Sequence, residues 1–154
     1  MNEREHLSYQ EFGDAVLNLA YDIKKSDFQP NIVLSIARGG CFLGSALGYA
    51  LGVKNSFTMN VEFYAGIDQR LPMPVVLPPV PNKVDLRGAT VLIADDVADS
   101  GETLRLVLDF WRGTVKEARS VVLYEKPRSV VKPDYVWRRT EKWIEFPWST
   151  GMPI

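Results

Sequence analysis

The sequence is poor in the residues that support disulfide, zinc or histidine chemistry. It has one cysteine, Cys41, and one histidine, His6, among 154 residues. A single cysteine excludes an internal disulfide and favours a cytoplasmic protein. His6 lies in a polar leader that has no signal-peptide core, and no apolar run is long enough to span a bilayer. We therefore expect a cytoplasmic protein without a membrane partner, whose chemistry does not depend on histidine or zinc.

The charge balance removes two more classes of function. The net charge is -1, from 18 basic and 19 acidic residues, so nothing in the overall electrostatics favours nucleic acid or an anionic membrane as a partner. Neither a Gly-x-Gly-x-x-Gly fingerprint nor a phosphate-binding P-loop motif is present, which argues against dinucleotide and P-loop nucleotide sites. The length predicts a single domain over 1–154. Any anion must therefore be bound by local geometry.

The most informative stretch runs from Val91 to Thr103. Its apolar start predicts a buried strand, its end predicts the first turn of a helix, and Asp95 and Asp96 lie between them. Amides at a helix N-terminus suit a phosphate, and carboxylates at the end of a strand suit sugar hydroxyls or Mg²⁺. Since successive strand residues point to opposite faces, we expect the chain to turn at this pair. Asp99 adds a third carboxylate, and the stretch predicts a site for a phosphorylated sugar.

The remaining pattern predicts the fold. A capping box at Ser8–Glu11 begins an amphipathic helix. Strands and helices then alternate, which predicts an α/β fold with an open, mostly parallel twisted sheet flanked by helices. The segment 65–83 contains five prolines and is predicted to be a functional or a disordered loop. The predicted strands are 31–37, 56–64, the apolar start of 91–103, 118–124 and 135–137, and the later helices begin at 41 and 102.

Two further features follow predicted strands. Arg38-Gly39-Gly40 precedes a helix and forms a candidate second phosphate site, because an arginine there can grip an anion in a bidentate manner. Lys126 ends a later strand, and the carboxyl edge of an open α/β sheet is where ligands bind. Trp143 and Trp148 come after the last predicted strand and are either core residues or a stacking wall for a flat heterocycle. Two phosphate sites around a sugar site predict a ribose with phosphate at one end and diphosphate at the other.

The stretch Asp95–Thr103 closely resembles the phosphoribosyl-diphosphate signature of the type I phosphoribosyltransferases. The segment 36–40 is similar to the pyrophosphate loop of that family, which often contains a cis peptide bond. The segments 124–127 and 143–148 are similar to the base-binding end of the 6-oxopurine enzymes, especially the xanthine–guanine and archaeal-type hypoxanthine–guanine branches. The resemblance therefore covers nearly the whole chain.

The resemblance implies an activity, a fold and a set of site residues. The activity would be Mg²⁺-dependent transfer of 5-phosphoribose to a 6-oxopurine in purine salvage, by a homodimer or homotetramer. The fold would include a lid loop at about 65–83 and a small C-terminal hood at about 125–154 that binds the base. Asp99 would also accept a proton from the base. Phosphoribosyl diphosphate would contact Arg38, Gly39, Asp95, Asp96, Ala98, Asp99, Ser100, Gly101, Glu102 and Thr103. The metal would be bound by Asp95 and Asp96. The base would contact Lys126, Trp143 and Ile144.

The chain departs from the family pattern in three places, and other functions stay open. Glu102 adds a carboxylate beside the phosphate turn, Ser149 stands where relatives commonly have an acidic residue, and the lid is unusually rich in proline. One alternative is a regulator of the same fold that senses phosphoribosyl diphosphate without turnover. Another is a phosphoribosyltransferase for a different base. A phosphorylation-receiver domain does not fit, because its acidic pair follows the first strand and Arg38-Gly39-Gly40 would be unexplained.

Overall fold

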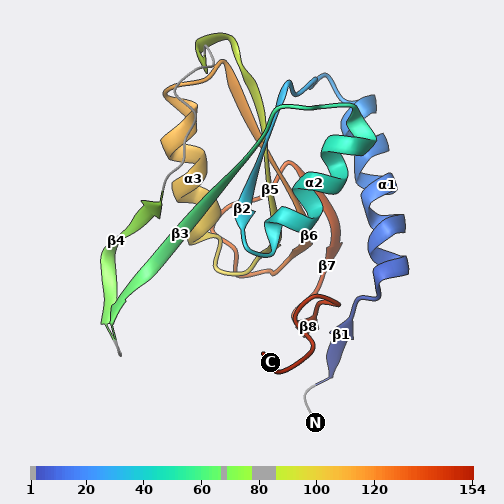
Figure 1. Ribbon diagram of the computed structural model, residues 1–154, viewed down its shortest axis with the longest axis vertical. Helices are drawn as coiled ribbons and strands as arrows, with labels where there is room; N and C mark the ends of the chain where they lie inside the picture. Colours follow the sequence, from blue (N-terminus) through green and yellow to red (C-terminus); the bar gives the residue numbers. More distant parts are fainter. Residues whose placement is uncertain (1–2, 67–68, 78–85) are drawn as a thin grey trace.

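The computed structural model describes residues 3–66, 69–77 and 86–154. A six-stranded sheet has the order β4-β3-β2-β5-β6-β7, and its strands are parallel except for β4 at the edge (Figure 1). This is the predicted open α/β sheet. Its strands are β2 (Ile32–Ala37), β3 (Ser56–Gly66), β4 (Gln69–Leu77), β5 (Thr90–Ala98), β6 (Glu117–Glu125) and β7 (Tyr135–Arg139). The helices are α1 (Tyr9–Lys25), α2 (Gly40–Leu51) and α3 (Glu102–Arg112), with a short 3-10 helix η1 (Leu86–Gly88).

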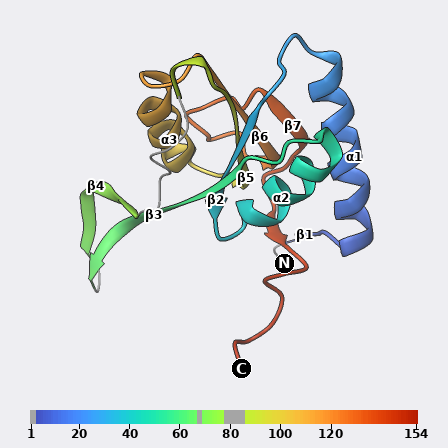
Figure 2. The same ribbon diagram turned by 45° about the horizontal axis from the view of Figure 1, so that its top comes forward.

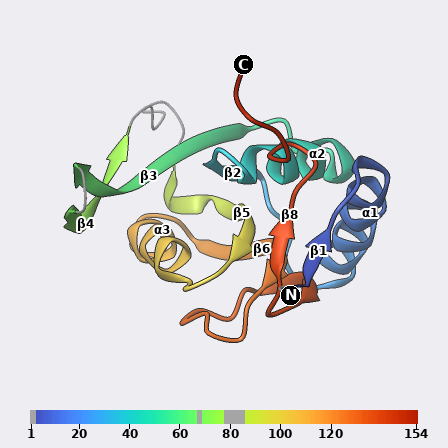
Figure 3. The ribbon, with the colours of Figure 1, turned by 90° about the horizontal axis from the view of Figure 1, so that it is seen from below.

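The sheet separates two apolar cores, and β5 contributes to both. Leu92 and Ala94 pack with the buried residues of α1 and α2. Val91 and Ile93 pack with those of α3 on the other face. Alternate strand residues point to opposite faces, so an uninterrupted apolar run is what a strand covered on both sides requires. Figure 3 shows α3 on one side of β5 and β6, with α2 and α1 on the other.

Local sequence signals explain where two of the helices lie. At the start of α1 the amide of Glu11 donates to the Ser8 hydroxyl at 3.1 Å, and that hydroxyl donates to the Glu11 carboxylate at 3.1 Å. Helix α2 packs close to the sheet because Gly44, which faces the sheet, has no side chain. A methyl group at Gly44 would lie 1.9 Å from the hydroxyl of Ser35 on β2. The N-cap prediction for α1 is confirmed.

The structure differs from the sequence prediction within the proline-rich segment. Residues 69–77, which we expected in a loop, form β4 and pair antiparallel with β3. This strand lies at the edge of the sheet and has a strand neighbour on one side only. Proline, which has no backbone N–H to donate, is tolerated in such an edge strand. The β3–β4 hairpin extends away from the helices (Figure 2). Residues 65–66 of the predicted lid end β3, and the remainder, at 67–68 and 78–83, lies outside the described residues.

A second small sheet is formed by the two ends of the chain. The leader that we expected to be merely polar contains β1 (Arg4–His6), which pairs in parallel with β8 (Trp143–Glu145). Figure 3 shows these two strands side by side. None of the helices in the described ranges has the length and apolar character to cross a membrane.

Candidate active site

Three predicted site segments meet at the carboxyl edge of the sheet. Strands β2, β5 and β6 are neighbours, so the turn after β2, the loop after β5 and the residue after β6 lie next to one another. These are the Arg38–Gly39 turn, the loop at 99–101 and Lys126. Parallel pairing places the ends of all three strands on the same edge. The sequence prediction that these segments form one site is consistent with this arrangement.

The acidic pair lies within a continuous strand. Strand β5 keeps its pairing with β6 through Asp95, opposite Val122, and on to Ala98, so the expected turn at the pair is wrong. The two side chains leave the strand on opposite faces, yet their carboxyl groups stay close enough to shift each other's pKa. Asp95 lines a cavity of about 90 Å³ at the start of α3. The Asp96 carboxylate lies against Gly39, where a methyl group would be 1.9 Å from Oδ2. The strand thus presents one carboxylate to each predicted phosphate site.

Burial dominates the electrostatics of the pair. It raises the pKa of Asp95 well above its usual range, and the neighbouring charge of Asp96 raises the pKa of Asp95 further. Burial also raises the pKa of Asp96, against hydrogen bonds from Asp95 and from the amide of Val97 that lower it. One Asp95 oxygen accepts the amide N–H of Asp96 at 2.9 Å. Two crowded carboxylates of this kind favour a ligand that brings a cation or hydroxyl groups.

We predict that Asp95→Asn stabilises the protein at neutral pH when no substrate is present. A carboxyl whose pKa is raised on folding contributes stability below its unfolded pKa and loses it as pH rises through the folded pKa. Asparagine resembles the protonated form at every pH. Thermal unfolding should therefore show a Tm gain over wild type that is larger at about pH 7.5 than at about pH 4, near the ordinary carboxyl pKa. The control variant Asp109→Asn, which changes an exposed carboxyl, should show no such trend. A variant less stable than wild type at neutral pH would contradict the burial argument.

The segment 98–103, which we name the phosphate loop for its predicted role, is built around Gly101. This residue has φ of 79°, a left-handed conformation that glycine adopts without cost. A methyl group there would also lie 2.4 Å from the hydroxyl of Ser129, so the loop after β6 packs directly on it. Ser100 Oγ accepts the amide N–H of Glu102, the first residue of α3, at 3.3 Å. The cavity at the start of α3 is lined by the predicted phosphate residues Ala98, Asp99, Ser100, Gly101 and Thr103, together with Asp95, Val97 and Leu104.

Arg128 contacts a predicted site residue, and the sequence prediction missed it. Its Nε donates to Asp99 Oδ1 at 2.6 Å, and its Nη2 forms an ion pair with the same oxygen. The Arg128 side chain is 69% exposed and that of Asp99 is 40% exposed. The sequence offers only one signal for Arg128, which is a cation two residues beyond Lys126. The contact itself depends on how the loop after β6 folds back over the loop after β5.

The loop after β2 is the other predicted phosphate site. The peptide bond between Ala37 and Arg38 is cis, as is frequent in the loop that this segment resembles. Gly40 begins α2, and a methyl group there would lie 2.4 Å from the carbonyl oxygen of Ala94. The chain at the helix start therefore lies directly on β5. Arg38 is exposed, so its guanidinium can reach an anion bound at this turn.

The predicted base residues also meet. The amide N–H of Lys126 donates to the carbonyl of Ala98 at 2.9 Å, which joins the end of β6 to the phosphate loop. Its ammonium lies 5.8 Å from the ring centre of Trp143. Trp143 is 65% exposed, so its ring can stack on a flat heterocycle, whereas Ile144 is buried. A cavity of about 510 Å³ is lined by both residues and by Arg4, Glu145 and 149–152.

Aromatic stacking anchors the chain beyond these residues. Trp148 stacks on Phe42 of α2 with ring centres 4.4 Å apart, and on Phe146 with centres 5.0 Å apart. It also meets Phe12 of α1 edge-on at 5.2 Å. The packing alternative for Trp148 is therefore the one observed. Trp143 and Trp148, which the sequence could not distinguish, have different environments.

The donor set fits a divalent cation that is shared with a substrate. Across the described ranges, no three His, Cys, Asp or Glu side chains form a group that could hold a metal by themselves. Mg²⁺ is commonly held by one or two carboxylates together with phosphate oxygens of the substrate. Asp95 and Asp96 supply carboxylates beside both predicted phosphate sites. These two residues therefore fit Mg²⁺ if phosphate oxygens of the substrate supply the remaining ligands.

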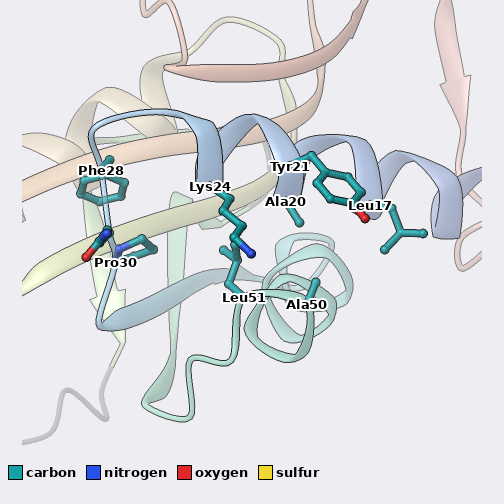
Figure 4. Close-up of a pocket in the computed structure, with 9 residues that line it drawn as sticks. Leu17, Ala20, Tyr21, Lys24, Phe28, Pro30, Ala50 and Leu51 are labelled. Atoms are coloured by element: carbon teal, nitrogen blue, oxygen red, sulfur yellow. The ribbon is translucent and has the colours of Figure 1, made fainter.

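Another cavity lies away from this edge. It has a volume of about 490 Å³ and lies between α1 and the C-terminal end of α2 (Figure 4). Leu17, Tyr21 and Lys24 of α1 line one side, and Leu51 of α2 lines another. The site segments meet the opposite, N-terminal end of α2. This cavity therefore belongs to a different face of the molecule.

Comparison with known proteins identifies the family. The model of the phosphoribosyl transferase domain matches residues 5–154. The xanthine-guanine phosphoribosyltransferase of Gluconobacter oxydans is 32% identical over 77% of this chain and 68% of that protein. The enzyme of that name from Chromohalobacter salexigens is 29% identical over 95% and 84%. The crystal structure of a purine phosphoribosyltransferase from Pyrococcus horikoshii has a TM-score of 0.85 at 33% identity, covering 98% of this chain and 97% of that one. The chain therefore belongs to the type I phosphoribosyltransferase family, among its purine enzymes.

Proposed function

We propose that this protein transfers 5-phosphoribose from phosphoribosyl diphosphate to a 6-oxopurine in purine salvage. The products are a purine nucleoside monophosphate and pyrophosphate. One observation carries the proposal. Lys126 is bonded to the phosphate loop through its backbone and approaches Trp143 with its ammonium, so a single residue joins the sugar-phosphate site to the base site. Guanine, hypoxanthine and xanthine all present a 6-oxo acceptor to that ammonium.

In the proposed site each group has a defined role. The amides at 98–103 hold the 5′-phosphate, Arg38 and Gly39 hold the pyrophosphate, and Asp95 and Asp96 hold the ribose hydroxyls. Trp143 stacks on the base, and the Ile144 backbone meets the 2-position of the ring. When bound by Asp95, Asp96 and substrate oxygens, Mg²⁺ supplies charge neutralisation for the pyrophosphate.

The proposed reaction exchanges one bond for another at the anomeric carbon. The bond from C1′ to the pyrophosphate oxygen breaks, and a bond from C1′ to N9 of the purine forms, through an oxocarbenium-like state. Pyrophosphate leaves with the bonding electrons. The proton on N7 of the purine passes to the Asp99 carboxylate. No covalent nucleophile is required, in keeping with a site built from carboxylates, amides and one ammonium.

A substrate panel tests this function. We expect pyrophosphate release, dependent on Mg²⁺, when the protein and phosphoribosyl diphosphate are mixed with hypoxanthine, guanine or xanthine. Adenine, orotate and uracil should release much less pyrophosphate, because none of them places a ring oxo group where the 6-oxo group of an oxopurine meets the Lys126 ammonium. Turnover of one of these bases and of no oxopurine would show that Lys126 and Trp143 are wrongly assigned.

A regulator that binds phosphoribosyl diphosphate without turnover is the second candidate. The resemblance of the phosphate loop of this protein to the family signature favours this second candidate, because such a loop can bind phosphoribosyl diphosphate without catalysing a reaction. The same panel distinguishes the two functions. Saturable binding of phosphoribosyl diphosphate with no pyrophosphate release from any base would favour the regulator.

The proposal includes self-association and a cytoplasmic setting. We infer a homodimer or homotetramer, supported by the exposed apolar side chains of Leu17 and Tyr21 on α1 and of Tyr49 on α2. Leu17 and Tyr21 are four residues apart and therefore adjacent on one face of α1, and apolar groups gathered on a surface mark interaction sites. Sedimentation velocity would measure the mass of the assembly. The single cysteine supports a cytoplasmic setting.

A further inference from the structure

The base-binding strand β8 is held along its side by the N-terminal strand. In the described part of the chain, β8 has β1 as its one strand partner. Arg4 lies opposite Trp143, Glu5 opposite Ile144 and His6 opposite Glu145. The amide N–H of Leu7 adds a hydrogen bond to the Glu145 carbonyl at 3.0 Å. Both strands have three residues, a length that gives little stability to a two-stranded pair. Their side chains must therefore supply much of what keeps them together.

Three ion pairs and a polar contact of His6 join every residue from 3 to 6 to the hood. Arg4 pairs with Glu145, and His6 Nδ1 lies 2.8 Å from the other oxygen of the same carboxylate. Glu3 pairs with Lys142 at 2.9 Å, and Glu5 with Arg138 of β7 at 3.3 Å. Isolated pairs on a surface contribute little, but several that act on one short strand form a network. The hood residues of this network lie on both sides of Trp143 and Ile144 in the sequence. Arg138 and Lys142 precede them, and Glu145 follows.

The rest of the hood is anchored elsewhere. The stacking of Trp148 on Phe42 and Phe146 fixes the chain after β8, and the pairing of β7 with β6 fixes the chain before it. Trp143 lies between these anchors and is exposed. Arg4 also lines the same cavity as Trp143 and Ile144. The lateral position of the stacking ring therefore depends on β1.

We propose that Arg4 is a positioning residue for the purine, acting through its ion pair with Glu145 to hold Trp143 and the Ile144 backbone in place. This inference rests on the proposed function, in which those two residues meet the base. Loss of the pair displaces β8 and weakens base binding. The phosphate loop and the Arg38–Gly39 turn belong to other elements, so binding of phosphoribosyl diphosphate is retained.

The test is a comparison of steady-state constants for both substrates. We expect Arg4→Ala and Glu145→Ala each to raise the KM for the preferred oxopurine roughly tenfold, since small displacements of a positioned group are costly. The KM for phosphoribosyl diphosphate should change less than about twofold. The charge swap Arg4→Glu with Glu145→Arg should recover most of the loss, because it restores the pair with reversed sign. Arg112→Ala, at the exposed end of α3, is the matched control and should behave as wild type.

Hydrogen exchange separates failure of this inference from failure of the proposed function. Arg4→Ala should speed exchange of the Leu7 amide, which is bonded to the Glu145 carbonyl, and the charge swap should slow it again. If wild type turns over no oxopurine, the proposed function fails. If wild type is active and Arg4→Ala leaves the base KM and the Leu7 exchange unchanged, the positioning role is wrong. An equal rise of both KM values, or no recovery in the swap, would overturn it as well.

Discussion

Asp99→Asn is expected to lower kcat by roughly 10²–10⁴, because asparagine has no carboxylate to accept the proton that leaves the purine. The substitution is nearly isosteric, so the cavity at the start of α3 keeps its shape. Substrate binding should change less than kcat, since the proton moves in the chemical step. Pre-steady-state measurement of nucleotide formation would isolate that step. Unchanged turnover would remove Asp99 from the role of proton acceptor.

Two controls separate the lost carboxylate from the lost ion pair. Asp99 binds Arg128, so Asp99→Asn weakens that contact as well. Arg128→Gln breaks the same pair and keeps the carboxylate, and its kcat should fall much less. Asp109→Asn removes an exposed carboxylate on α3 and should leave kcat as in wild type. If Arg128→Gln reproduced the full loss, the ion pair rather than the proton acceptor would explain the effect.

Gly40→Ala is expected to destabilise the protein by about 3 kcal/mol, because its methyl group has no space. The added carbon would lie 2.4 Å from the carbonyl oxygen of Ala94 and 3.0 Å from the Cα of Asp95. Both atoms belong to the backbone of the central strand, so a side-chain rotation cannot relieve the clash. For a chain of this size we expect the Tm to fall by roughly 10 °C. The displaced segment also carries Asp95, so activity should fall too.

Gly13→Ala is the matched control on stability. Gly13 lies in α1, is exposed, and has no heavy atom within 4 Å of the position that a methyl group would take. Alanine is favoured over glycine in a helix interior by about 1 kcal/mol, so this variant should be slightly more stable than wild type. Urea unfolding of both variants would measure the difference. A Gly40→Ala protein as stable as Gly13→Ala would show that α2 can move away from β5.

The sequence alone determined the features that depend on local pattern. The apolar run of β5 required cover on both faces, the alternation of strands and helices required parallel pairing, and Ser8–Glu11 located the start of α1. Parallel pairing in turn placed the Arg38–Gly39 turn, the phosphate loop and Lys126 on one edge. A long and specific motif at Asp95–Thr103 indicated the family before any geometry was known.

The tertiary structure decided the features that depend on segments far apart in the sequence. It kept β5 extended through Asp95 and Asp96, because pairing with β6 continues to Ala98. It brought Arg128 onto Asp99 and β1 onto β8, contacts that span 29 and 141 residues for the Arg128–Asp99 and Arg4–Glu145 pairs. It also made β4 an edge strand despite its prolines. Such contacts form between surfaces that exist only after the sheet has assembled, and neither the local periodicity nor the charge of either segment specifies its partner.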